Sequence, residues 1–418
     1  MKIKHNYKEG FINYCQICNN KNIKEVFNLG FQPLADDLRA EEKKFENVIS
    51  YPINIFFCNK CILLQNNFIV GDKQLYSDKY HYRPGISKTV RENQLKLAKQ
   101  IINDYKLNYS EFIIDIGSND GTLLNQFKNI GFQNLLGVEP TNTIKFQKAL
   151  KINSIKSFYN LDTSRKIKKI YGKAKIILTT NVFAHSNKME DFIKSVRNNL
   201  KNNGVFIIEN HYLLDVIKKK QFDTFYHEHL RTYSLRSLIN LMKYYGFKII
   251  HARTSERYGG NIQAHFALQN SNFKTTKNVN QILKNEKKEN LHKINTYLDF
   301  KKKIDLQGKI LENYLEKNKH KIIVAKAFPA RAAVILHYYS FLKKYIKYIA
   351  EQKSSLKLNK YVAGTKLKIV DSRIMKKNKP DIIIILAWHL FSPIFNKWKK
   401  LGLTKSKYVK LLPKLIIK

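Results

Sequence analysis

Residues 111–121 read EFIIDIGSNDG, an apolar run that ends on glycine and continues into a polar turn. The apolar run predicts a short buried strand, and the pattern after the turn predicts a helix that begins near Thr122. Glycines in such a turn allow a sharp bend and let the backbone approach a ligand closely. The segment therefore predicts a ligand-binding loop at the carboxyl end of a strand.

Similar apolar runs extend outward from this segment and alternate with helical patterns. A helix is predicted over residues 89–105, and strands are predicted over 135–139, 175–180 and 204–209. Strands of this kind that alternate with helices indicate a mostly parallel, doubly wound sheet. The predicted fold class is therefore α/β.

A second α/β unit is predicted near the C-terminus, with strands over 321–325, 367–371 and 381–386 and a helix from about Arg331. It follows a Lys-, Asn- and Glu-rich stretch, residues 275–319, which predicts a mostly solvated helical linker. The 418 residues suffice for two or three domains at about 150 residues each. We expect divisions after residues 80 and 272.

All four cysteines fall in Cys-x-x-Cys pairs near the N-terminus, Cys15 with Cys18 and Cys58 with Cys61. Each pair can place two thiolates on one tight turn, and two facing turns form the closed tetrahedral site that Zn²⁺ prefers. Buried cysteines without a metal are one alternative. A redox pair is another, although a thioredoxin-type pair would not occur twice. We expect a structural Zn²⁺ site in a module over residues 1–80.

The predicted loop carries two carboxylates, Asp115 and Asp120. It lacks both the Gly-x-Gly-x-x-Gly pattern of dinucleotide sites and the Lys-Ser/Thr pair of phosphate loops. Carboxylates favour a ligand with positive charge or hydroxyl groups, and Glu139, at the end of the next strand, is placed to accept hydrogen bonds from a ribose. S-adenosylmethionine has both a sulfonium and a ribose. A Gly/Asn/Asp turn without a ligand is the alternative.

A run of titratable residues, Tyr226-His227-Glu228-His229, is unusual in this Lys-rich chain. His229 with Glu228 can serve as a general base with a neighbouring carboxylate, because an imidazole accepts protons near neutral pH. A metal site fits less well, since His227 and His229 do not have the i, i+4 spacing of a helical zinc site. Surface residues, or residues that cap a helix over 234–245, are equally compatible with the run.

Two further aromatic and imidazole groups lie upstream, in Tyr80-His81-Tyr82 and in NVFAH, residues 181–185. The second group follows a predicted strand, at the edge where ligands bind in open α/β sheets. Taken singly, each group is more typical of packing than of chemistry.

The motifs, in their order along the chain, resemble those of the sugar C-methyltransferases that act on nucleotide-linked 4-keto-deoxysugars. They are Cys-x-x-Cys twice, Tyr-x-Tyr, IGSNDGTLL, GVEP, NVFAH, FDTFYHEHL and Tyr-Ser-Leu. The resemblance covers essentially the whole chain, because AFPARA (327–332), VAGTKLKI (362–369) and PDIIIILAWH (380–389) resemble that family's C-terminal domain.

This resemblance implies three domains. They are a zinc-binding domain over residues 1–80, a Rossmann-like class I methyltransferase domain that binds S-adenosylmethionine over 81–272, and a second Rossmann-like α/β domain over 273–418 that helps to bind the substrate, a nucleotide-diphosphate sugar. The implied reaction is C-methylation, most simply at the 3-position, by His-catalysed enolisation and methyl transfer.

The resemblance also implies the roles of individual residues. The cofactor would be bound from the loop and the strand ends, by Asp115, Gly117, Asn119, Asp120, Gly121, Glu139 and Asn181. His229 would be the general base, and the sugar would be surrounded by Glu228, Tyr226, His185 and a tyrosine of the Tyr80/Tyr82 pair.

Departures from the family pattern leave the sugar and the nucleotide open. Pro84-Gly85 stands where the family usually has serines, Tyr258-Gly259-Gly260-Asn261 replaces a His-Gly-Gly-Ser pattern, and Lys326-Ala327-Phe328 replaces a glycine-rich start. An O- or N-methyltransferase acting on a sugar or small metabolite is the alternative enzyme, since it needs a base but no ketone.

The 76 basic and 32 acidic residues give a formal net charge of +44, which raises the alternative of a nucleic-acid-binding zinc protein or RNA methyltransferase. Such a protein would cluster Lys and Arg with aromatics on one face, whereas these lysines occur in every segment. We therefore expect no nucleic-acid partner. We also expect no membrane span, a cytoplasmic location, and a monomer or weak dimer.

Overall fold

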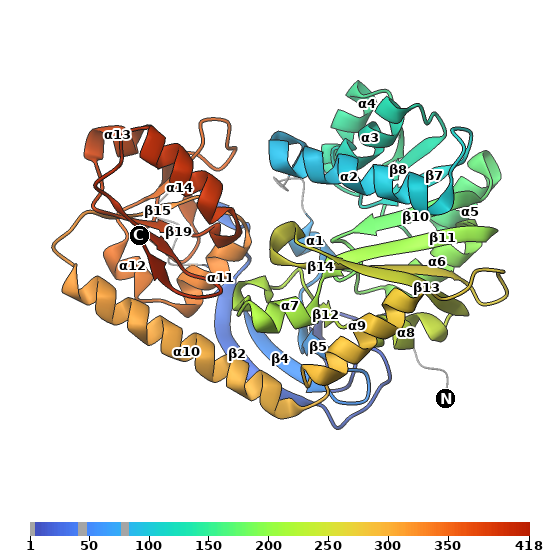
Figure 1. Cartoon of the computed structure of the whole chain (residues 1–418), viewed down its shortest axis with the longest axis horizontal. Helices are drawn as coiled ribbons and strands as arrows, with labels where there is room; N and C mark the ends of the chain where they lie inside the picture. The colour runs from blue at the N-terminus through green and yellow to red at the C-terminus, as the bar shows by residue number, and fades with distance from the viewer. Residues whose placement is uncertain (1–4, 41–47, 77–82) are drawn as a thin grey trace.

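The computed structural model of the chain describes residues 5–40, 48–76 and 83–418. Two α/β lobes lie side by side, with the N-terminal strands β2 (Lys24–Pro33) and β4 (Ser50–Cys58) between them (Figure 1). The long helix α10 (Ile294–Lys317) runs along one side of the molecule, past these strands to the C-terminal lobe (Figure 1).

A seven-stranded sheet forms the centre of the first lobe, in the order β13-β14-β11-β10-β7-β8-β9. Its strands are β7 (Ile113–Ile116), β8 (Leu135–Val138), β9 (Asn153–Ile155), β10 (Ala174–Thr180), β11 (Leu200–His211), β13 (Phe247–Ser255) and β14 (Asn261–Leu268). The first five pair in parallel, and β13 and β14 add an antiparallel hairpin at one edge. The predicted mostly parallel, doubly wound sheet is confirmed.

Helices cover both faces of this sheet because successive strand residues point to opposite sides. Ile113 packs in one core with α2 and α3, whereas Ile114 packs in the other with α5, α6 and α8. The helices are α2 (Lys88–Tyr105), α3 (Thr122–Ile130), α4 (Lys145–Ala149), α5 (Leu161–Tyr171), α6 (Met189–Asn199), α7 (Leu213–Lys218) and α8 (Leu235–Lys243).

The N-terminal residues build a four-stranded sheet in the order β12-β5-β4-β2. Strand β5 (Leu63–Asn66) pairs with β12 (Arg231–Tyr233), which comes from the first lobe. Three short elements complete this region: β1 (Gly10–Phe11), β6 (Phe68–Ile69) and α1 (Asp72–Leu75). A further strand, β3 (Leu38–Arg39), pairs with β17 (Tyr361–Val362) of the C-terminal lobe, so both lobes contribute strands to the N-terminal region.

The C-terminal lobe holds a six-stranded sheet in the order β18-β16-β15-β19-β20-β21, parallel except for β21. Its strands are β15 (Ile323–Lys326), β16 (Ile349–Glu351), β18 (Ile369–Asp371), β19 (Ile382–Ile385), β20 (Lys407–Lys410) and β21 (Ile416–Ile417). Its helices are α11 (Arg331–Tyr338), α12 (Leu342–Tyr345), α13 (Ile374–Asn378) and α14 (Phe391–Lys400). The strand order reverses at β15, as in Rossmann-like sheets.

The stretch predicted as a solvated linker forms α9 (Lys277–Lys288) and α10. On α10, Tyr297, Phe300, Ile304, Leu311 and Leu315 are buried. Their spacing of three, four and seven residues places them on one helical face. The expectation of a solvated linker therefore holds only for the opposite face. Among the described residues, no helix is long and apolar enough to cross a membrane.

Candidate functional site

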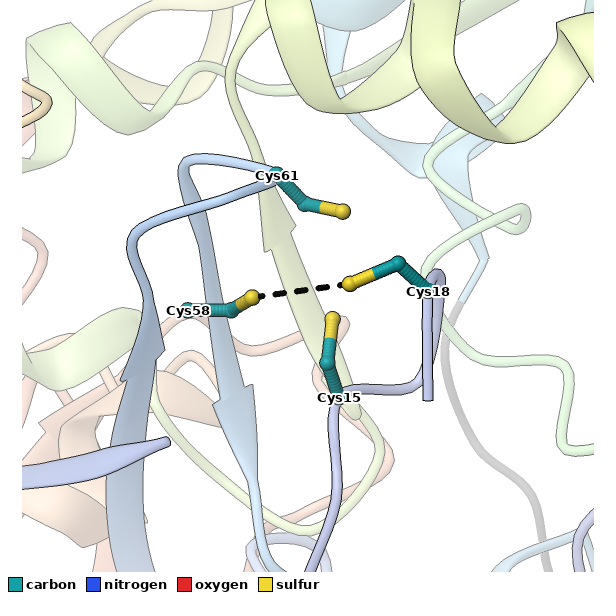
Figure 2. Close-up of side chains that lie close together, drawn as sticks. All are labelled: Cys15, Cys18, Cys58 and Cys61. Carbon is teal, nitrogen blue, oxygen red and sulfur yellow. Dashed lines mark hydrogen bonds between the residues drawn. The ribbon is translucent and has the colours of Figure 1, made fainter. Parts of the chain in front are cut away.

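The four cysteine sulfurs converge on one point. Their Sγ atoms all lie within 4.8 Å of one another, and those of Cys18 and Cys58 are 3.8 Å apart (Figure 2). A tetrahedral zinc with Zn–S bonds of about 2.3 Å requires sulfur–sulfur separations of about 3.8 Å. No disulfide joins the four thiols. The donor set and its spacing therefore fit a structural Zn²⁺.

Both Cys-x-x-Cys turns have the same local geometry. The carbonyl of Cys15 accepts from the amide of Asn19 at 3.0 Å, and that of Cys58 accepts from the amide of Ile62 at 2.8 Å. Asn19 and Ile62, each directly after the second cysteine of its pair, both have φ of 55°. The repeated turn explains why two residues separate the cysteines, because that spacing lets both thiols point to the same side.

The second cysteine pair is joined directly to the histidine-rich segment. Strand β5 begins two residues after Cys61 and pairs with β12, which begins two residues after His229. The hydroxyl of Ser234 donates to the carbonyl of Ile62 at 2.8 Å. The zinc turn therefore supports the chain immediately after the predicted general base.

The loop after β7 forms the wall of a cavity. Gly117 has φ of 69°, and a Cβ at this position would lie 2.4 Å from a methyl carbon of Val182. Only glycine allows the loops after β7 and β10 to come this close. The cavity, of about 240 Å³, is lined by five predicted cofactor residues: Asp115, Gly117, Asn119, Glu139 and Asn181.

Two carboxylates on this wall can serve a ligand with hydroxyl groups or positive charge. Asp115 Oδ1 is buried and has no hydrogen-bond partner within the described part of the chain. Burial, followed by the charge of Glu139, raises the pKa of Asp115 to about 8. Glu139 accepts from the amides of Asn119 and Thr141, each at 2.9 Å, and a carboxylate has lone pairs left for further donors. These acceptors fit the ribose hydroxyl groups of S-adenosylmethionine.

Asp120 and Gly121 do not line the cavity. Asp120 Oδ2 instead accepts from the amide of Gly85 at 2.9 Å, and Oδ1 accepts from the hydroxyl of Thr122 at 2.5 Å. Gly121 is the N-cap of α3. Asp120 thus holds the loop to the segment before α2, and Gly121 starts the helix that follows the loop.

His185 and Tyr258 line the same cavity from the side of the histidine-rich segment. His185 Nδ1 lies 3.1 Å from the hydroxyl of Tyr76, another lining residue. Its ring centroid is 4.9 Å from that of His229, which is not among the lining residues. The predicted base is therefore separated from the cofactor loop by one imidazole.

His229 is buried and held in one tautomer. Its Nδ1 lies 2.6 Å from the carbonyl oxygen of Thr224. Because a carbonyl only accepts, Nδ1 carries the proton and Nε2 presents a lone pair. Burial lowers the pKa of His229 to about 4, with a partly opposing contribution from the Thr224 hydrogen bond and a further lowering by Arg331. The side chain is thus a neutral acceptor at neutral pH.

Other predicted catalytic residues surround this ring. The Tyr226 ring centroid lies 4.1 Å from that of His229. Glu228 Oε2 lies 3.9 Å from Nδ1 of His185, so this carboxyl faces His185, and the orienting partner of His229 is a backbone carbonyl. Burial raises the pKa of Glu228 to about 8. Tyr80 and Tyr82 lie outside the described residues.

Neither alternative for the first histidine of the run holds. His227 is buried, and its Nε2 lies 3.1 Å from the carbonyl of Tyr51 in β4, so it is not a surface residue, and it belongs to no metal-binding cluster of the described residues. The N-cap of α8 is Ser234, whose hydroxyl accepts from the amide of Ser237 at 3.0 Å. His227, Glu228 and His229 are therefore buried, and Tyr226 is half-buried.

Several residues beside the predicted base were not expected from the sequence. His211 lies beside His229 with ring centroids 5.0 Å apart, and His389 Nδ1 has no hydrogen-bond partner in the described ranges. Arg331 and Trp388, from the C-terminal lobe, both donate to the buried carboxylate of Asp223. A lone Arg in the apolar run AFPARAAVIL was the available signal.

Three family models match consecutive parts of the chain. They describe a zinc binding domain over residues 15–76, a methyltransferase domain over 89–252 and a C-methyltransferase C-terminal domain over 256–413. The C-methyltransferase NovU of Streptomyces niveus is 22% identical over 393 residues, which cover 93% of this chain and 93% of NovU. The chain belongs to the S-adenosylmethionine-dependent C-methyltransferases. The C-methyltransferase takes S-adenosylmethionine as its cofactor and has a zinc-binding cluster of four cysteines.

Two solved methyltransferase structures are similar to part of this C-methyltransferase. A S-adenosylmethionine-dependent methyltransferase from Clostridium acetobutylicum is 15% identical and covers 43% of this chain and 92% of its own, with a TM-score of 0.34. The magnesium protoporphyrin IX methyltransferase ChlM from Synechocystis, solved with bound SAM, is 12% identical and covers 42% of this chain and 78% of its own, with a TM-score of 0.31.

Proposed function

We propose that this C-methyltransferase methylates carbon 3 of a nucleotide-activated 4-keto-deoxysugar, with His229 as the general base. The observation that carries the proposal is the pinned tautomer of His229. Its Nδ1 is committed to the carbonyl of Thr224 at 2.6 Å, which leaves Nε2 as a proton acceptor. Carbon methylation next to a ketone needs such an acceptor, because a C–H proton must leave before the new C–C bond forms.

The residues around His229 suit enolate formation. A hydrogen beside a ketone becomes acidic enough for an imidazole when donors stabilise the developing enolate oxygen. Burial raises the pKa of Tyr226 well above its ordinary value, so its hydroxyl stays a donor. Burial lowers the pKa of His185 well below its ordinary value, and a neutral imidazole can also donate from one nitrogen.

The cofactor cavity lies on the other side of His185. Bound S-adenosylmethionine supplies an electrophilic methyl group and leaves as a neutral thioether. Asp115, Glu139 and Asn181 would hold it through their side chains, and Gly117 and Asn119 through the loop. The chain then has to align the enolate carbon with that methyl group and keep water out, which is mainly a matter of positioning.

We propose that the C-terminal lobe binds the nucleotide diphosphate. Strands β15 and β19 point their carboxyl ends towards Asp223 and the histidines, as the contacts of Arg331 and Trp388 require. We also propose that the domain boundaries lie after residues 80 and 272. The second boundary falls just beyond β14, the last strand of the central sheet.

The proposal is tested by product analysis. The enzyme is incubated with S-adenosylmethionine and a panel of 4-keto-6-deoxyhexose nucleotides, and products are analysed by mass spectrometry and carbon NMR. We expect one new methyl group on the carbon beside the ketone. Without the cofactor, incubation in heavy water should introduce deuterium at the same carbon. A methyl group on oxygen or nitrogen, or product without deuterium exchange, would contradict the proposal and favour O- or N-methylation.

A further inference from the structure

Arg331 joins the C-terminal lobe to the segment just before the histidine run. Its Nε and Nη2 each donate to one oxygen of Asp223, both at 2.7 Å, which is a two-pronged contact. Nη2 also donates to Oε1 of Gln221 at 3.1 Å, and Nη1 donates to the carbonyl of Tyr258 at 3.0 Å. The Asp223 side chain is completely buried, and that of Arg331 is 8% exposed.

Asp223 lies at the carboxyl edge of the C-terminal sheet, where Rossmann-like sheets bind ligands. Arg331 begins α11, directly after the loop that follows β15. Trp388 follows β19, the strand next to β15, and its indole N–H donates to Asp223 Oδ2 at 2.8 Å. The segments that follow the two central strands therefore each supply a donor to one carboxylate of the other lobe.

The same short segment fixes His229. Phe222–Thr224 form a single 3₁₀ turn, so the carboxylate of Asp223 and the carbonyl of Thr224 belong to one rigid unit. The carbonyl of Thr224 holds Nδ1 of His229 at 2.6 Å. A displacement of Asp223 would move this carbonyl, and the His229 ring would lose the contact that selects its tautomer.

The loop that contains Tyr258 and Gly259 is also held by residues of the C-terminal lobe. Gly259 has φ of 97°, and a Cβ there would lie 2.8 Å from both Gln221 Oε1 and the Trp388 ring. Arg331 holds the carbonyl of Tyr258, and Tyr258 lines the cofactor cavity. The guanidinium of Arg331 therefore contacts two segments: the one that orients His229, through Asp223, and the loop that lines the cofactor cavity, through Tyr258.

We propose that Arg331 and Asp223 are positioning residues, through which the C-terminal lobe sets the orientation and tautomer of His229. This inference rests on the proposed role of His229 as the general base. It gives the second Rossmann-like lobe a part in proton abstraction that is separate from substrate binding. The competing account is that the pair only docks the two lobes.

The kinetic test uses Arg331→Gln, Arg331→Lys and Asp223→Asn, with Arg253→Gln as the matched control. Arg253 of β13 forms an ion pair with Asp104 of α2 and lies near His251 and His265, which are not part of the group around His229. We expect Arg331→Gln and Asp223→Asn to lower kcat by about 100-fold, the scale of a misplaced general base, while KM for both substrates changes less than about threefold. Arg331→Lys should recover part of kcat, and Arg253→Gln should leave it unchanged.

A spectroscopic test needs no substrate. Protein is labelled with ¹⁵N-histidine, and the His229 signal is identified as the one that is absent from the spectrum of His229→Gln. In the wild type this signal should show the Nδ1–H tautomer. Asparagine has the same shape as aspartate. In Asp223→Asn and in Arg331→Lys, the ¹⁵N signal of His229 should show a mixture of the Nδ1–H and Nε2–H tautomers. Unchanged tautomer and kcat in these variants would overturn the inference, and so would an effect confined to KM. If His229→Gln itself stays active, the proposed function fails first.

Discussion

His229 donates its Nδ1 proton to the carbonyl oxygen of Thr224, five residues earlier in the chain, at 2.6 Å. The direction of this bond cannot reverse, because the carbonyl has no proton to give. The ring therefore keeps its second nitrogen as an acceptor for as long as the 3₁₀ turn over Phe222–Thr224 holds its place. The expected properties of the enzyme follow largely from this arrangement.

Replacing His229 by Gln should stop proton abstraction. We expect kcat to fall by about 10²–10⁴-fold, the usual contribution of a general base, while S-adenosylmethionine affinity changes less than about twofold. Deuterium exchange into the sugar and calorimetric cofactor binding measure the two effects. His251→Asn, on a half-buried histidine of β13 that faces Thr276, is the control. If His185→Gln abolished exchange and His229→Gln did not, His185 would be the base.

The acid side of the pH profile should reflect the buried state of His229. A general base must be unprotonated, and burial lowers the pKa of His229 to about 4. We therefore expect kcat/KM to stay level from neutral pH down to about pH 5, and to fall at lower pH. His185 and His211 also have lowered pKa values, and burial raises the pKa of Glu228 to about 8, so none of them gains charge in that range. A halving of kcat/KM near pH 6.5 would contradict this expectation.

Folding must be followed over the same pH range by circular dichroism. Histidines that are neutral when buried take up protons near pH 6.5 once the chain unfolds. The unfolded state then binds more protons, so the contribution of His185, His211 and His229 to stability decreases as pH falls below about 6.5. Rates measured where the native signal is intact report on the base alone.

Removing the metal should lower both stability and activity. We expect one zinc per chain, and its removal by a chelator should lower Tm by about 10 °C or more, because structural zinc contributes folding energy directly. Activity should be lost with it, since β5, which follows Cys61, pairs with β12, which follows His229. Ser234→Ala, which removes the hydrogen bond to Ile62 and the N-cap of α8 but leaves the cysteines intact, should lower Tm without loss of zinc. Full activity in metal-free protein with four titratable thiols would refute the assignment.

The two loop aspartates should respond differently to amide replacement. Asp115→Asn removes a buried carboxyl group that lines the cavity, and we expect cofactor affinity to fall by about tenfold or more, with Tm unchanged or raised. Asp120→Asn should mainly lower Tm, because that carboxylate holds Gly85 and Thr122. Calorimetry of cofactor binding and thermal unfolding measure both variants. The reverse order of effects would mean that Asp120 is the cofactor ligand.

The local parts of this structure could be predicted from the sequence. EFIIDIGSNDG gives β7, its loop and the start of α3, because the apolar run, the glycines and the polar turn each act within a few residues. The paired cysteines gave the metal cluster for the same reason, since their spacing is a property of one turn. The predicted second α/β unit is also present, although the described structure adds β16, β20 and β21 to its sheet.

The contacts between distant parts could not be predicted in this way. Asp223 and Arg331 are 108 residues apart, and neither has a neighbour in sequence that signals the pairing. The prediction that residues 275–319 are mostly solvated was wrong for one helical face. The average composition of the stretch is polar, although Tyr297, Ile304 and Leu311 form a buried row on α10. Likewise, Glu228 follows His227 in the sequence and faces His185 in the fold. Such relationships depend on how the lobes pack.

The pairing of β5 with β12 affects the order in which the chain can be completed during synthesis. The zinc turns leave the ribosome well before β12, so the sheet beside them lacks its edge strand until residue 233 has emerged. A second strand, β3, cannot pair until β17 has been synthesised, that is, until residue 362 has emerged. Domains usually fold as units from the N-terminus during translation. Here the zinc-binding segment is made well before the strands that complete it, and the unpaired edges of β5 and β3 can pair with other chains until then.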